Sequence, residues 1–76
     1  MAASSQRDLD IVNQHIAEAE ERIGRQTDLV EELRRDHQGT VAEEAAQLLS
    51  TMVDALEELK ERRRIIIEKL NPPKPP

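Results

Sequence analysis

His15 and Glu18 are the residues whose types and spacing come closest to a metal site. They stand three positions apart, the spacing at which carboxylate and histidine ligands bind metals inside helical bundles. In such bundles the ligands project into the core, whereas the pattern around these two residues places His15 beside the apolar face and Glu18 outward. The helical stretches contain no Glu-x-x-His motif. A metal-binding helical bundle is therefore a distant alternative, and we expect no metal and no other cofactor.

The basic run Arg62-Arg63-Arg64 is the second feature with a chemical character of its own. A nucleic-acid contact needs a broader basic face and ideally aromatic side chains that stack on bases. The chain has no aromatic residue and a net charge of −5. We therefore expect no nucleic-acid partner, and expect these arginines to form ion pairs with the nearby Glu58, Glu61 and Glu68.

Catalytic and membrane-spanning patterns are not visible in the sequence. There is no glycine-rich phosphate loop or nucleophile elbow, and without cysteine there is no thiol chemistry. A two-helix protein also has too little interior for a substrate pocket of several hundred Å³. No apolar run approaches the roughly 20 residues that cross a bilayer, and residues 1–8 lack the apolar stretch of a secretory signal. We expect a cytoplasmic protein that is not an enzyme, with no small-molecule substrate and no membrane partner.

The elements that position these residues follow from a repeating pattern of small and apolar side chains. The chain of 76 residues is 37% hydrophobic and 36% charged, a mixture typical of long helices and coiled coils. Apolar residues recur at alternating steps of three and four, which is the rhythm of a coiled-coil seam. We call these positions the seam: Leu9, Val12, Ile16, Ala19, Ile23, Gln26, Val30 and Leu33, then Ala42, Ala45, Leu49, Met52, Leu56, Leu59, Arg63, Ile66 and Leu70.

Turn and cap signals divide the chain at residues 38–40. Gly39 tolerates the left-handed conformation that commonly ends a helix, and Thr40 with Glu43 has the spacing of a capping box. Ser5 with Asp8 forms a weaker cap signal for the first helix. The sequence predicts a disordered segment 1–5, helices at about 6–37 and 41–70, and a proline-rich disordered tail 71–76.

The expected fold class is all-α, a two-helix antiparallel coiled-coil hairpin. The rival is one continuous helix that forms a long coiled-coil dimer. A reversal near Gly39 brings the two seams together layer by layer, with Leu9 facing Leu70 and Val12 facing Ile66. This agreement over the whole length favours the hairpin.

Charged residues are expected to support that arrangement. Across the helices, Asp8 would face Lys69 and Glu20 would face Lys60. Within the helices, four pairs have the favourable four-residue spacing: Glu18–Arg22, Glu21–Arg25, Glu31–Arg35 and Glu58–Arg62. His37 lies near the end of the first helix, where a histidine interacts favourably with the helix dipole.

The candidate interface consists of six large apolar residues outside the seam. They are Ile11, Leu29, Leu48, Val53, Ile65 and Ile67. A lone hairpin buries only one face of each helix, and dimerisation into a four-helix bundle is a common way to cover another. We therefore expect a self-associating interaction module, a homodimer. The alternative is a small regulatory adaptor that binds a different protein through the Ile11/Ile65/Ile67 surface.

Part of the chain resembles a pattern in short uncharacterised alphaproteobacterial helical-hairpin proteins. The matching segments are residues 15–23 (HIAEAEERI), then Arg25-Gln26, Leu33-Arg34 and Gly39-Thr40. The resemblance covers about half of the chain, mainly the first helix, whereas the second helix departs from the pattern. It implies a bacterial helical hairpin and carries over no catalytic or binding residue.

Overall fold

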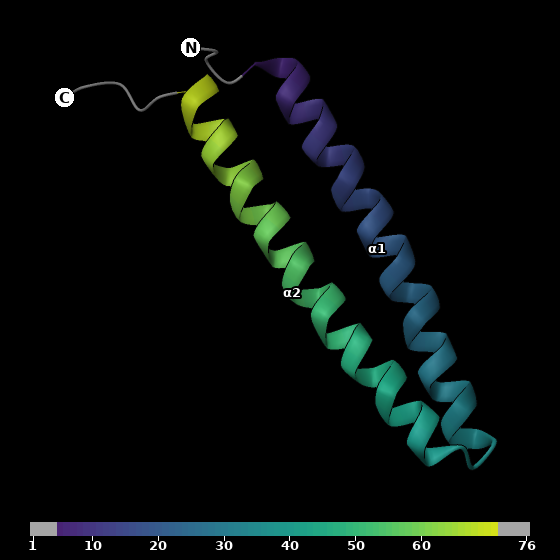
Figure 1. The fold of residues 1–76 in the computed structure, drawn as a ribbon. Helices are drawn as coiled ribbons and strands as arrows, with labels where there is room; N and C mark the ends of the chain where they lie inside the picture. Colours follow the sequence, from purple (N-terminus) through teal and green to yellow (C-terminus); the bar gives the residue numbers. More distant parts are fainter. Residues whose placement is uncertain (1–4, 72–76) are drawn as a thin grey trace.

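Residues 5–71 are described by the computed structural model as two α-helices joined by a short turn. The first helix, α1, spans Gln6–Arg35 and the second, α2, spans Gly39–Leu70. They run in opposite directions side by side, so the start of α1 and the end of α2 lie together at what we call the open end (Figure 1). The expected all-α hairpin is confirmed. The predicted tail lies, apart from Asn71, outside the described residues.

The seam forms the interface between the two helices. Eight of its residues are buried: Val12, Ile16, Ala19, Val30, Ala42, Ala45, Leu56 and Ile66. Every other seam position is half-buried, including the polar Gln26 and Arg63. The spacing of apolar residues therefore identified correctly which side of each helix turns inward.

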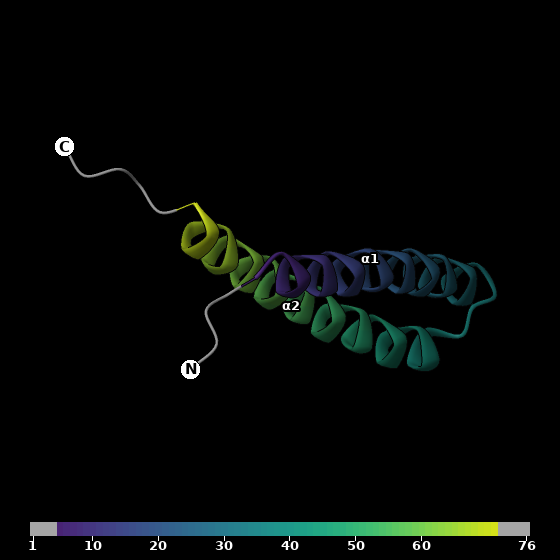
Figure 2. The same ribbon diagram turned by 90° about the horizontal axis from the view of Figure 1, so that it is seen from above.

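The core is continuous over the half of the hairpin nearest the open end. Val12, Ile16 and Ala19 of α1 form one cluster with Leu56 and Ile66 of α2. The two helices are inclined to each other. They lie side by side in Figure 1 at the open end, whereas at the turn they lie side by side in the view from above (Figure 2). Such an inclination is typical of side chains that interdigitate along a three–four seam.

The two polar seam residues each find a partner on the opposite helix. Gln26 Nε2 donates a hydrogen bond to the backbone carbonyl of Ala45 at 2.9 Å. Arg63 Nη1 lies 3.4 Å from Asn13 Oδ1, with its stem along the seam and its guanidinium at the edge. Because a half-buried polar group is costly without a partner, these contacts help to fix how the helices are aligned.

Ser5 precedes α1 as its N-cap and forms a complete capping box with Asp8. The Asp8 amide donates to Ser5 Oγ at 3.3 Å, and the Ser5 amide donates to Asp8 Oδ2 at 3.0 Å. The expectation that residue 5 belongs to a disordered segment is therefore wrong, because its hydroxyl satisfies an amide that the helix leaves without a partner.

The turn differs from the expectation at Gly39, Thr40 and Glu43. The helix α1 ends at Arg35, and His37, not Gly39, takes the left-handed conformation with φ of 59°. The His37 and Gln38 amides donate to the carbonyls of Arg34 and Leu33, which is the Schellman arrangement.

The second helix consequently starts earlier than the sequence suggested. It begins at Gly39 after Gln38, and no side chain caps it, so the predicted capping box of Thr40 and Glu43 is not formed. Closing the first helix two residues earlier places Thr40 inside α2. The box needs Thr40 in an extended conformation at the boundary, and a helical residue does not provide it.

Substitutions at the turn test this assignment. His37→Gly should raise the free energy of unfolding by about 0.5–1 kcal/mol, because glycine adopts a positive φ without a Cβ clash. Gly39→Ala should also stabilise, by about 0.4–1 kcal/mol, since no atom lies within 4 Å of an added Cβ. Urea unfolding followed by circular dichroism measures both changes. Destabilisation by Gly39→Ala would instead place the left-handed residue at Gly39.

Candidate interaction surface

A groove runs along one flank of the hairpin at its open end. Its volume is about 530 Å³, and it is open to solvent. Ile11 and His15 of α1 and Ile65 and Arg62 of α2 form its sides, with buried Val12 and Ile66 beneath them. The expectation of too little interior for a substrate pocket concerned the space between the helices, whereas this groove lies on their outer surface.

A second depression continues the groove toward the middle of the hairpin. It measures about 360 Å³ and is lined by Arg22 of α1 and Ala55 of α2, above Ala19, Met52 and Leu59. The two depressions share the same flank of each helix. Asp8, His15 and Arg22 recur every seven residues on α1, and Ala55, Arg62 and Lys69 do so on α2.

Continuing both seven-residue series toward the turn adds three exposed aliphatic residues. The next member on α1 is Leu29, and the preceding members on α2 are Leu48 and Val41. We call this flank the groove face, and its large exposed aliphatic residues are Ile11, Leu29, Val41, Leu48 and Ile65, with 40% to 53% of their surface exposed. Val41 was missed in the sequence because its position was taken as the start of the helix.

Val53 and Ile67 lie on the opposite flank of α2. They are exposed, at 40% and 42%, as the sequence predicted. However, they belong to the seven-residue series of Lys60, and no member of that series lines either depression. The predicted Ile11/Ile65/Ile67 cluster is therefore divided: Ile65 and Ile67 are two positions apart on a helix, about 200° around its axis, with buried Ile66 between them.

The ion pairs differ from the predicted set. Within residues 5–71, every ion pair joins two residues of one helix. Glu21–Arg25 forms at 3.3 Å as expected. Lys60 pairs with Glu57 rather than with Glu20, because a neighbour one turn away is reached without crossing the seam.

Three predicted pairs that involve charges of the groove face are not formed in the described part of the chain. Glu18–Arg22, Glu58–Arg62 and the cross-helix pair Asp8–Lys69 were predicted, and none is an ion pair of the structure. The predicted pair Glu31–Arg35, on the outer surface of α1, is also not among the ion pairs of residues 5–71. Exposed pairs contribute only about 0–1 kcal/mol, so long side chains leave them readily.

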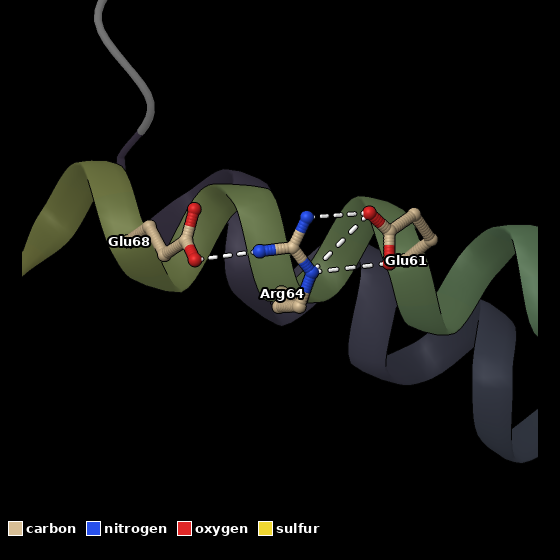
Figure 3. Close-up of polar contacts among 3 residues, drawn as sticks. All are labelled: Glu61, Arg64 and Glu68. Atoms are coloured by element: carbon tan, nitrogen blue, oxygen red, sulfur yellow. Dashed lines mark hydrogen bonds and ion pairs between the residues drawn. The ribbon is translucent and has the colours of Figure 1, made fainter.

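The three consecutive arginines point in different directions. Arg62 lines the groove, Arg63 reaches across to Asn13, and Arg64 lies on the outer surface of α2. There Arg64 is held between Glu61 and Glu68, with Nε 3.1 Å from Glu61 Oε2 and Nη1 2.6 Å from Glu68 Oε1 (Figure 3). The cluster therefore does not present one basic patch.

Arg64 also changes the titration of Glu61. Hydrogen bonds from Arg64 hold the pKa of Glu61 below its ordinary value of 4.5, with charge attraction adding to the effect and desolvation opposing it. The same contacts raise the pKa of Arg64.

A carbon-13 titration of the glutamate carboxyl groups should therefore give Glu61 a midpoint below 4.5, and Arg64→Ala should bring it back toward 4.5. Because the folded pKa is the lower one, the stabilisation is present above pH 4.5 and is lost as the pH falls through the folded pKa. An unchanged Glu61 midpoint in Arg64→Ala would contradict the ion pair.

Residues 5–71 contain neither a cluster of metal-binding side chains nor a helix that could span a membrane. No group of three or more histidine or carboxylate side chains there is arranged to hold a metal ion, and His15 and Glu18 are both exposed. Neither of the two described helices combines the length and apolar character that spanning a bilayer requires.

Comparison with known proteins found no matching family model, no matching curated protein and no matching solved structure.

Proposed function

We propose that the protein is a non-enzymatic interaction module that self-associates through the groove face of its hairpin. The observation that carries the proposal is the alignment of five exposed aliphatic side chains on one flank. An isolated apolar residue at a surface needs no explanation, but a row of them along one face marks an interaction site. A helix layer is stable when its apolar stripe is covered by another layer, and the hairpin covers only the seam.

The dimensions of the hairpin support a dimer. A helix of about 30 residues is roughly 45 Å long, and the molecule is about 20 Å across its narrow direction. The projected face is then roughly 900 Å², close to the roughly 800 Å² that each partner contributes to a standard interface. A second hairpin on this face would complete a four-helix bundle.

Stability gives a second reason for association. A chain below about 80 residues rarely gains more than 3–5 kcal/mol from its own core and often adds oligomerisation. Here three of the eight buried side chains are alanines, which bury little area. Burial of further aliphatic surface against a second copy would supply what the single seam lacks.

Size-exclusion chromatography with light scattering tests the proposal. In concentrated solution the measured mass should correspond to two chains, and on dilution it should fall toward the mass of one chain. The concentration at which it falls gives Kd. A monomer at concentrations up to the millimolar range would overturn self-association. In that case the adaptor alternative, in which a different protein covers the same face, becomes the better explanation.

A further inference from the structure

Four of the five apolar residues of the groove face form two groups that are spaced nearly equally on both helices. Ile11 and Ile65 lie at the open end, and Leu29 and Leu48 lie toward the turn. Eighteen residues separate the pair on α1, about 27 Å, and seventeen residues separate the pair on α2, about 26 Å. Two apolar patches at equal spacing are what a self-complementary interface requires, because each patch can meet the other on a second copy.

We propose that the partner of the groove face is a second copy docked antiparallel, with α1 on α1 and α2 on α2; this inference rests on the proposed self-association. The two-fold axis crosses the helices near Glu20 of α1 and between Leu56 and Glu57 of α2. Ile11 then meets Leu29 of the second copy, and Ile65 meets Leu48 of the second copy. Each contact occurs twice in the dimer.

The charges between the apolar patches favour this direction. With Ile11 on Leu29, Glu18 falls opposite Arg22 of the second copy, and with Ile65 on Leu48, Lys69 falls opposite Glu44. These four side chains are exposed and form no ion pair within the described part of the hairpin. They are therefore available to a partner. The cost is one like-charge approach, Asp8 toward Glu32, at the rim of the interface.

Parallel docking places the same charges less well. A two-fold axis along the helices would place α1 of one copy on α2 of the second copy. Each residue of α1 would then lie level with the α2 residue that it faces across the groove of its own hairpin. Glu18 would then meet Glu58 of the second copy, and Glu32 would meet Glu44. Only Asp8 and Lys69 would form an opposite pair. Because like charges across an interface discriminate against a binding mode, the antiparallel dimer is the favoured one.

Glu18→Lys distinguishes the two directions by the sign of its effect. In the antiparallel dimer the new lysine faces Arg22 of the second copy twice, and we expect Kd to rise about tenfold at low salt. The double variant Glu18→Lys/Arg22→Glu exchanges the charges and should return Kd to within about threefold of the unchanged protein. In a parallel dimer Glu18→Lys would remove the repulsion by Glu58 and lower Kd, which would overturn the proposal.

Glu21→Lys is the matched control for this series. It also reverses a glutamate of α1, and it breaks the Glu21–Arg25 ion pair. Glu21 belongs to the seven-residue series of Gln14 and Asp28, which lines neither depression, whereas Glu18 belongs to the series of Ile11, which lines the groove. Its Kd should stay close to that of the unchanged protein. An equal effect of Glu21→Lys and Glu18→Lys would mean that the change acts through helix stability rather than through the interface.

A distance measurement reads the direction without any charge change. The chain has no cysteine, so Asp10→Cys carries a single spin label at an exposed site away from the groove. Antiparallel docking separates the two labels by about 20 residues along the bundle, about 30 Å, whereas parallel docking places them level. A dimer with level labels overturns the orientation alone, while a monomer in light scattering overturns the self-association on which it rests.

Discussion

Ile65→Asp should convert the proposed dimer into monomers, whereas Ile67→Asp should leave that dimer intact. The two isoleucines are equally exposed in the hairpin, at 40% and 42%, and lie on either side of buried Ile66. Only Ile65 lines the groove. Burying an unpaired carboxylate at its site, twice per dimer, costs several kcal/mol and also removes the aliphatic contact. We therefore expect Kd to rise at least about a hundredfold, which corresponds to about 3 kcal/mol.

Light scattering measures the mass of each variant, and circular dichroism shows whether the helices persist. Both variants should keep their helical spectrum at concentrations where the unchanged protein is folded, because neither residue belongs to the seam. Ile67→Asp is the control for adding one negative charge near the open end. Dissociation by Ile67→Asp with no effect of Ile65→Asp would move the interface to the opposite flank, where Val53 also lies.

Ile16→Ala should have the largest effect on folding. Ile16 is 4% exposed and belongs to the core cluster, which holds residues of both helices. Shortening a buried isoleucine to alanine costs about 2–5 kcal/mol, because aliphatic burial is lost and a cavity remains. A core of this size supplies only about 3–5 kcal/mol. The variant should therefore be largely unfolded near 25 °C at low protein concentration.

Thermal unfolding monitored by circular dichroism tests this expectation. Ile67→Ala is the matched control, since it makes the same side-chain change at a site that is 42% exposed and outside the seam. It should lower the free energy of unfolding by less than about 1 kcal/mol. Equal losses in the two variants would mean that the seam is not the main source of stability.

The sequence predicted the two helices and the seam residues that pack between them, because both follow from the pattern of side chains within a single helix. A three–four apolar rhythm marks the same side of a helix whatever the helix packs against, so Val12, Leu56 and Ile66 were correctly placed. The structure places the left-handed residue of the turn two positions before the predicted Gly39. Glycine is the usual left-handed residue, yet His37 takes that conformation, since the length of each helix is set by seam contacts as well as by its cap.

The candidate interface was predicted residue by residue but not as a surface. All six residues chosen from the sequence are exposed in the hairpin. Their grouping was only partly right, because Ile67 was joined to Ile11 and Ile65. The position of a residue around its own helix is enough to predict that it points away from the seam. Whether it lines a groove also depends on which flanks of the two helices lie next to each other.

The amino-acid sequence by itself determined the all-α class, the two helices, the seam and the absence of aromatic and thiol chemistry. These properties follow from composition and from a periodicity within single helices. The tertiary structure decided that Ile11 and Ile65 share one groove while Ile67 lies across the seam from it. It also decided which charges of residues 5–71 form ion pairs, because a long charged side chain pairs with whichever neighbour the packed helices bring within reach.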